Sequence, residues 1–185
     1  AYLGVRITPG PTPPGATEAR LMANLADGIH SISSRVGPHI EGCLIEGHSD
    51  DGVAIHGKYS LVLMNAGGPV IAGHTEAAPF SIGERLRLSA GSNGAILGEA
   101  TLQAVTALEG AQRGEAESIK NGMKLGNRQL YSSLRSYWRL ALDPDRPLTA
   151  GDVIDSPTRS GSGFIVRSNT IRNHRARGIL IKASD

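Results

Sequence analysis

The chain has 185 residues, enough for one domain or for one domain with a small insertion. Its 24 glycines, its low aromatic content of 4% and its short runs of β-branched residues favour many short strands over a helical bundle. A net charge of +2 with interspersed signs excludes an extended basic face for nucleic acid, and no apolar run reaches membrane-spanning length. The single cysteine excludes an intrachain disulfide.

The first segment, residues 1–57, carries two copies of one short pattern. Residues 27–31 (DGIHS) align with residues 51–55 (DGVAI) at an offset of 24 residues. A period in the low twenties, with apolar strands and glycine at the corners, is typical of coils that bury their inner faces against neighbouring coils. We therefore predict a right-handed parallel β-helix, in which Val53 and Ile55 point inward while Ala54 points outward. A leucine-rich or hexapeptide solenoid is the alternative, but neither consensus is present.

The middle segment, residues 58–160, does not repeat. It is too long for a loop in a compact fold, so we expect a small β-rich subdomain inserted into one coil. Strands are expected at residues 60–64, 85–89 and 104–107, and a helix within residues 115–141 that ends at Trp138 and Leu140. The phrases SIGE (81–84) and TAGD (149–152) are typical of turns that lead into a strand.

The last segment, residues 161–185, returns to the repeat. Residues 163–183 align without gaps on residues 37–57, at an offset of 126 residues. The apolar positions and the glycine are kept, whereas Asp50-Asp51 in the earlier copy become Ala176-Arg177. Since the chain opens and stops in strand-like sequence, we expect it to be the middle of a longer protein. Exposed coil ends are unpaired edges, which makes self-association through them an expected property.

The repeat predicts a group of three carboxylates. Equivalent positions of neighbouring coils lie about 4.8 Å apart, so Asp27 and Asp51 share a column, and Asp50 projects from the same turn. Such a group suits glycoside hydrolysis with inversion. Asp27 and Asp51 would activate water, and Asp50 would protonate the leaving oxygen. Arg177, in the same column, would hold the substrate or tune the carboxylates, although Asp-Gly pairs can also simply form coil corners.

Three further residues can line a sugar-binding cleft beside these aspartates. His30 and His56 follow them on outward-facing positions, and Tyr59 can stack on a sugar face; structural histidines at coil edges are the alternative. Calcium bound by the aspartates is the competing chemistry. The histidines lack zinc-site spacing, so we expect no metal and no other cofactor.

The motifs ADGIH (26–30), SDDGVAIHG (49–57) and NHRARGILIKA (173–183) resemble those of glycoside hydrolase family 110. That family comprises β-helix exo-α-1,3-galactosidases that remove terminal galactose with inversion. The resemblance implies a solenoid of the pectin-lyase type, an oligosaccharide substrate, a secreted or extracellular enzyme, and essential aspartates at Asp27, Asp50 and Asp51. The chain departs from the family at Ala54, where an asparagine or similar polar residue is expected.

Other functions remain open from the sequence. Polygalacturonases share the arrangement of one aspartate followed by an aspartate pair, and Lys182 resembles their substrate-binding lysine, but their Asn-Thr-Asp and Gly-His-Gly motifs are absent. A non-catalytic carbohydrate-binding or adhesive β-helix is the second class of function. A calcium-dependent lyase is the third.

Overall fold

The computed structural model describes residues 1–65, 70–74, 80–123 and 134–182. The chain divides into two compact units. One unit consists of Ala1–Lys58 with Thr158–Asp185, and the other consists of Tyr59–Pro157. We call them the stacked-sheet unit and the barrel unit.

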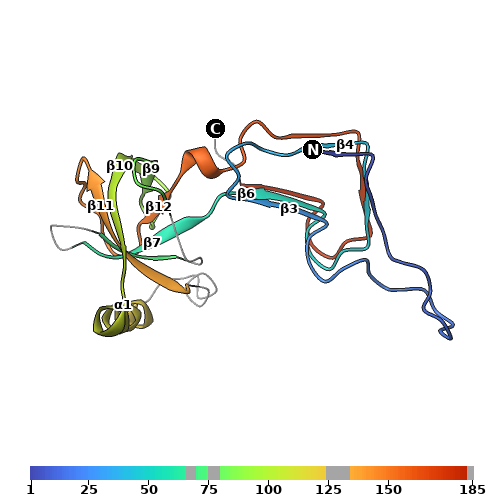
Figure 1. The fold of residues 1–185 in the computed structure, drawn as a ribbon, viewed down its shortest axis with the longest axis horizontal. Coiled ribbons are helices and arrows are strands. Elements are labelled where there is room, and N and C mark those ends of the chain that lie inside the picture. The colour runs from blue at the N-terminus through green and yellow to red at the C-terminus, as the bar shows by residue number, and fades with distance from the viewer. Residues whose placement is uncertain (66–69, 75–79, 124–133, 183–185) are drawn as a thin grey trace. The chain divides into compact units, whose positions relative to one another are not determined.

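The stacked-sheet unit contains three parallel sheets of three strands each. The first sheet has the order β1 (Tyr2–Leu3), β4 (His39–Glu41), β13 (Ile165–Arg167). The second has the order β2 (Arg6–Ile7), β5 (Leu44–Glu46), β14 (Thr170–Arg172). The third has the order β3 (Ile29–Ile32), β6 (Val53–His56), β15 (Ile179–Lys182). Figure 1 shows β3 and β6 side by side.

The strand registers confirm both repeat alignments. Ile45 pairs with Ile171, and Val53 pairs with Ile179, as the offset of 126 residues predicts. On the other side of β6, Ile29 pairs with Val53, as the offset of 24 residues predicts. Equivalent residues therefore form columns that run across neighbouring strands.

The apolar columns form the core of this unit, and the middle strands contribute its most buried residues. Ile40, Ile45 and Ile55 are fully buried. Ile179 and Ile181, in contrast, are 47% and 41% exposed, because β15 pairs with a neighbour on one side only. Val53 and Ile55 belong to the core cluster, as predicted, and Ala54 does not, although its small side chain is also covered and only 1% exposed.

The residue just before each strand of the third sheet is a glycine: Gly28, Gly52 and Gly178. We call these residues the glycine column. A Cβ atom added to Gly52 would lie 2.3 Å from Ile171 Cγ2 and 2.6 Å from the carbonyl oxygen of Gly178. A Cβ atom added to Gly28 would lie 2.5 Å from the carbonyl oxygen of Gly52. Only glycine fits these two positions.

The barrel unit is a closed antiparallel barrel of six strands in the order β10-β11-β8-β7-β12-β9. Its strands are β7 (Tyr59–Met64), β8 (Val70–His74), β9 (Arg85–Ser89), β10 (Ile96–Ala107), β11 (Ser136–Asp143) and β12 (Val153–Asp155). Its larger core cluster consists of Val62, Val70, Ala72, Phe80, Leu86, Leu88, Ala100, Leu102, Leu140, Leu148 and Ile154.

The two turns at residues 81–84 and 149–152 share one geometry. In each, the third residue is a glycine with a positive φ, 83° in the first turn and 101° in the second. The acidic fourth residue accepts a hydrogen bond from the backbone N–H of the first residue, at 2.9 Å and 2.7 Å. The turn predictions are confirmed, as are the three predicted strands.

The helix prediction is corrected. Helix α1 spans Gly110–Gly122 and buries Ala116. Trp138 and Leu140 lie in β11, where alternation places Leu140 in the barrel core. The predicted continuation over residues 124–133 lies outside the described residues. One short 3-10 helix, Pro157–Arg159, follows β12.

The prediction of a right-handed parallel β-helix with a small inserted subdomain is wrong as a fold class. Most strand residues belong to the closed antiparallel barrel, and each parallel sheet has only three strands of two to four residues. The repeat correctly indicated which strands are parallel. It covers only short segments, however, and says nothing about the middle segment, which forms the closed barrel. The all-β class stands. Among the described residues, no helix combines the length and the apolar character needed to cross a membrane.

Candidate active site

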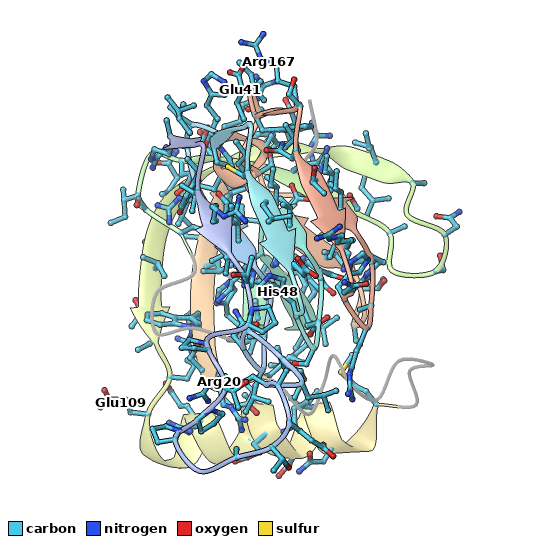
Figure 2. All side chains as sticks on the ribbon, turned by 90° about the vertical axis from the view of Figure 1, so that its right-hand side faces the viewer. Arg20, Glu41, His48, Glu109 and Arg167 are labelled. Carbon is cyan, nitrogen blue, oxygen red and sulfur yellow. The ribbon has the colours of Figure 1, made fainter. Side chains whose placement is uncertain are left out.

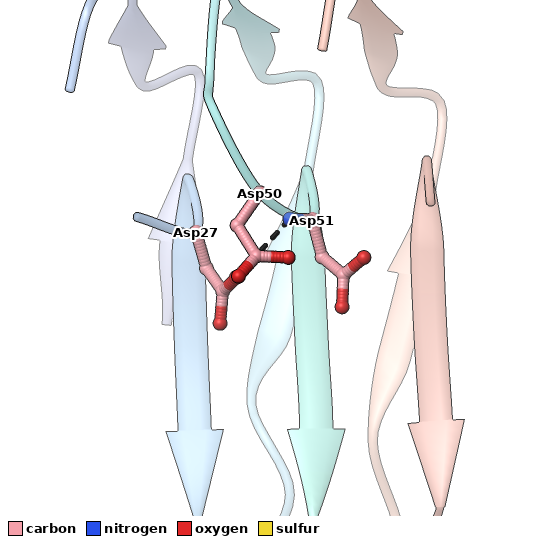
Figure 3. A group of neighbouring side chains, drawn as sticks. All are labelled: Asp27, Asp50 and Asp51. Carbon is pink, nitrogen blue, oxygen red and sulfur yellow. Dashed lines mark hydrogen bonds between the residues drawn. The ribbon is translucent and has the colours of Figure 1, made fainter. Parts of the chain in front are cut away.

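Three aspartates meet where two neighbouring strands begin. Asp27 precedes β3, and Asp50 with Asp51 precedes β6. Because β3 and β6 pair in parallel and in register, the two turns lie at the same level. One carboxylate oxygen from each aspartate can be chosen so that all three lie within 4.8 Å of one another. Figure 3 draws the three side chains, which we call the carboxylate corner.

Two of these carboxylates also accept hydrogen bonds from backbone N–H groups. The Asp27 side chain accepts a hydrogen bond from the backbone N–H of Asp51, with 3.1 Å between Oδ1 and N (Figure 3). The Asp51 side chain accepts one from the backbone N–H of Arg177, with 2.9 Å between Oδ1 and N. Each carboxylate thus binds the amide that follows it in the same column, which gives both aspartates a structural role.

Asp51 is paired with a guanidinium group. Nε of Arg177 lies 2.9 Å from Oδ1 of Asp51, and Nη2 of Arg177 lies 3.0 Å from Oδ2. Burial acts to raise the pKa of Asp51, but the hydrogen bonds and the charge of Arg177 outweigh it, so the pKa lies below its ordinary value. Asp51 therefore holds its negative charge more strongly than an ordinary aspartate, which makes it a poor proton donor.

Asp50 differs from its two neighbours. Its residue is exposed, and its carboxylate makes no hydrogen bond to any residue in the described part of the chain. Of the three carboxylates, it is the one whose oxygens can approach a bound molecule without breaking an internal contact.

The other carboxylate columns of this unit are paired with cations. Glu41 binds Arg167 at 2.9 Å and His39 at 2.7 Å, and Figure 2 shows Glu41 and Arg167 side by side. Glu46 binds Arg172 at 3.2 Å. Hydrogen bonds from Arg167 and His39 lower the pKa of Glu41. Hydrogen bonds from Asn173 and Arg172 lower the pKa of Glu46. The carboxylate corner, in contrast, gathers three anions around one guanidinium.

Two histidines extend the carboxylate corner. Nδ1 of His30 lies 3.2 Å from Oδ2 of Asp27, and its Nε2 lies 2.8 Å from Nε2 of His56. Nδ1 of His56 lies 2.8 Å from the carbonyl oxygen of Gly57. The structure therefore brings both predicted histidines to the aspartates, although neither has a ring nitrogen without a protein partner.

The remaining predicted residues fall in different places. Lys182 is exposed on β15 in register with His56, and its charge contributes to the lowered pKa of Asp51. Tyr59 begins β7 of the barrel unit and is 40% exposed, and burial of its phenol raises its pKa. Arg177, Lys182 and the two histidines belong to the same unit as the carboxylate corner.

Sequence reasoning missed two residues that support the carboxylate corner. Asn24 donates from Nδ2 to the backbone carbonyl of Asp27 at 3.0 Å, and its Oδ1 accepts from Nδ1 of His48 at 2.9 Å. His48, labelled in Figure 2, is fully buried, and its Nε2 has no hydrogen-bond partner among the described residues. Burial, reinforced by His174, lowers the pKa of His48. The signal was available, because Asn24 and His48 are also 24 residues apart and His48 and His174 are 126 apart.

Carboxylates at this spacing are within reach of a common cation. We assign no metal ion to the carboxylate corner, because both oxygens of Asp51 are already hydrogen-bonded to Arg177. The arrangement supports proton transfer and the stabilisation of a developing positive charge.

Neither a comparison of the sequence with models of known protein families nor a search of curated proteins found a match. The likeness to family 110 therefore rests on the three quoted motifs.

Proposed function

We propose that the carboxylate corner is the catalytic site of a glycoside hydrolase that removes terminal α-1,3-linked galactose with inversion. The observation that carries the proposal is the gathering of Asp27, Asp50 and Asp51 oxygens within 4.8 Å, with a guanidinium bound to Asp51 alone. Like charges held this close cost free energy, and such groups concentrate at functional sites. The substrate and the stereochemistry come from the family resemblance.

The contacts suggest a distinct role for each aspartate. Asp50 is the acid, because its exposed oxygens can reach a glycosidic oxygen without breaking an internal contact. Asp27 is the base, held in place by the Asp51 amide and by His30. Asp51, kept ionised by Arg177, stabilises the positive charge that develops at the anomeric carbon. This revises the sequence-based roles, in which Asp27 and Asp51 together activate water.

The oxygen spacing bears on the stereochemistry. Inverting glycosidases usually hold their two carboxyl groups about 6.5–9.5 Å apart, and retaining enzymes about 5–5.5 Å apart. The nearest oxygens here lie within 4.8 Å of one another, which is no closer to the inverting than to the retaining spacing, so inversion is proposed from the family resemblance alone. The anomer of the first released sugar is therefore the sharpest readout.

The experiment is proton NMR of the protein mixed with galactose-α-1,3-galactose, with the anomeric signals followed from the earliest minutes. We expect β-galactose to appear first. Asp50→Asn should lower kcat by about a hundredfold to ten-thousandfold while substrate binding persists. Asp145→Asn, which changes an exposed aspartate of the barrel unit, should leave kcat unchanged. Initial release of α-galactose would contradict inversion, and no release by a folded sample would contradict the substrate.

A non-catalytic carbohydrate-binding module is the second candidate. It is favoured by the backbone contacts of Asp27 and Asp51, which explain both residues without any chemistry. In that case the protein would bind galactosides without releasing galactose, and Asp50→Asn would change affinity alone.

A further inference from the structure

The loop that carries Asp27 is held by an asparagine and a buried histidine. Nδ2 of Asn24 donates a hydrogen bond to the backbone carbonyl oxygen of Asp27 at 3.0 Å. Oδ1 of Asn24 accepts one from the backbone N–H of Ala26 at 3.3 Å and lies 2.9 Å from Nδ1 of His48. The Asn24 side chain therefore contacts its own loop at two points and the neighbouring segment at a third.

The contacts of Asn24 determine where His48 carries its hydrogen. The Nδ2 group of Asn24 must face the carbonyl oxygen of Asp27, because two facing oxygens form no hydrogen bond. Oδ1 of Asn24 then faces His48, and since a carbonyl oxygen only accepts, Nδ1 of His48 is the donor. In the neutral ring, Nε2 of His48 therefore carries no hydrogen.

His48 also packs against the other end of the Asp27 loop. Its side chain is fully buried, and a Cβ atom added to Gly28 would lie 2.9 Å from its Nε2. That nitrogen has no hydrogen-bond partner among the described residues. The imidazole thus lies against Asn24 before Asp27 and against Gly28 after it.

Backbone pairing leaves a gap at the same place. The N–H groups of Gly28 and Ile29 donate to carbonyl oxygens of the neighbouring segment at 2.9 Å and 3.0 Å, so regular pairing begins only after Asp27. The preceding backbone bridge joins Asn24 to His48. Residues 25–27 span the distance between these two points, and the Asn24 side chain is bound to both ends of that span.

We propose that Asn24 and His48 are positioning residues that hold the Asp27 carboxylate against the backbone N–H of Asp51. This inference rests on the proposed function for its catalytic meaning, because Asp27 is the base there. The N–H of Asp51 lies 3.1 Å from Oδ1 of Asp27 (Figure 3). A displacement of about 1 Å in a catalytic group can lower the rate about a hundredfold, so support of this loop affects turnover although neither residue contacts the substrate.

The unpartnered nitrogen of His48 makes this support sensitive to acid. Burial, together with the nearby His174, lowers the pKa of His48, although the charge of Asp27 acts in the opposite direction. Protonation would add an N–H at Nε2 that faces Gly28 without an acceptor. The support should therefore weaken when the pH falls to the folded-state pKa of His48, below 6.5.

The first test needs no activity, so it decides the support of the loop even if the protein releases no galactose. In 15N NMR of the whole chain at neutral pH, His48 should carry hydrogen on Nδ1 and none on Nε2. The reverse would overturn the proposal.

Hydrogen exchange then tests whether Asn24 keeps Asp27 in place. In Asn24→Ala, the amide hydrogen of Asp51 should exchange at least about tenfold faster. The amide of Gly52, which is bonded to the carbonyl oxygen of Arg177 at 2.9 Å, should keep its rate. An unchanged rate at Asp51, or equal acceleration at both amides, would overturn the positioning role.

Kinetics separate positioning from a general effect on stability. Asn24→Ala should lower kcat about ten- to hundredfold with KM unchanged. His48→Asn places an amide where Nδ1 lies and should keep most of kcat, whereas His48→Gln lacks a donor there and should lose as much as Asn24→Ala. Asn93→Ala removes a similar contact with backbone in the barrel unit and should leave both constants unchanged. Equal kcat in the two His48 variants, or an unchanged kcat in Asn24→Ala, would contradict the assignment.

Discussion

Asp152 of the barrel unit and Asp50 of the stacked-sheet unit are used in opposite ways. In the barrel unit, Asp152 is buried and accepts hydrogen bonds from the backbone of Gly91 and from Thr149, so it fixes a turn. In the stacked-sheet unit, Asp50 is exposed, makes no hydrogen bond to a described residue, and lies close to two other carboxylates.

The difference follows from how each unit is closed. Every barrel strand pairs on both sides, so the barrel has no open edge, and the Asp152 side chain stabilises a turn between its strands. The stacked sheets repeat one strand pattern in register, which aligns equivalent positions into columns with open edges. A column can gather like charges at one place, and the proposed chemistry lies there.

Core truncation should test whether the units are energetically separate. Leu88→Ala in the barrel and Ile45→Ala in the stacked sheets each remove a fully buried side chain, at an expected cost of about 2–5 kcal/mol of unfolding free energy. Trp138, the only tryptophan, packs against the barrel core. In guanidinium unfolding, Leu88→Ala should shift the Trp138 fluorescence transition, and Ile45→Ala should shift only the circular-dichroism signal. Equal fluorescence shifts would show one cooperative unit.

The glycine column offers a comparison within the stacked sheets. Gly52→Ala should cost about 1–3 kcal/mol, because its Cβ would lie 2.3 Å from Cγ2 of Ile171 and 2.6 Å from the carbonyl oxygen of Gly178. Gly178→Ala is the matched control at the edge, where the nearest atoms belong to the His174 ring at 3.6 Å, and it should be nearly neutral. Thermal unfolding of both variants measures the contrast. A similar loss in both would mean that the space beside β15 is filled.

Acid should weaken the stacked sheets through His48. Because the folded-state pKa of His48 is lowered from 6.5, the unfolded chain binds a proton first as the pH falls. Stability is therefore complete above pH 6.5 and declines from there down to the folded-state pKa. His48→Asn, which copies Asn24 of the same column, should flatten this decline in denaturant titrations at successive pH values. An unchanged slope would show that folding does not lower the pKa of His48.

The smallest effect on stability is expected at the open edge of β15. We propose self-association through this edge, because it presents exposed Ile179 and Ile181 beside unpaired backbone groups. Ile181→Lys should change the unfolding free energy by no more than about 0.5 kcal/mol while reducing association in sedimentation velocity. Ile96→Lys, an exposed position in the barrel unit, is the control. Equal association in all three proteins would contradict an edge contact.

The sequence predicted local pairing well and the overall fold poorly. The alignment of Ile45 with Ile171 specified the register of two strands 126 residues apart, because backbone pairing requires equivalent residues to face one another. It could not show that the middle segment closes into a barrel, since closure depends on how six strands of different length meet. The exposure of Ile179 cannot be predicted for a related reason, because a sequence pattern does not reveal which strand lies at an edge.

The carboxylate corner was predictable in membership but less so in its contacts. The offset of 24 residues brought Asp27 and Asp51 into one column, and the neighbouring Asp50 followed. The supporting pair of Asn24 and His48 was missed, although it has the same offset. The hydrogen bond between His30 and His56 depends on side-chain rotamers, which no spacing in the sequence determines.

The bond between Arg177 and Asp51 joins residues on either side of the whole barrel segment. On a ribosome, all three aspartates are made before the barrel, and the guanidinium that neutralises Asp51 is made after it. Until then the aspartates repel one another without that partner, and closing so long a loop has an entropic cost. The carboxylate corner can therefore be completed only late in synthesis, after the barrel segment and the following residues up to Arg177 have been translated.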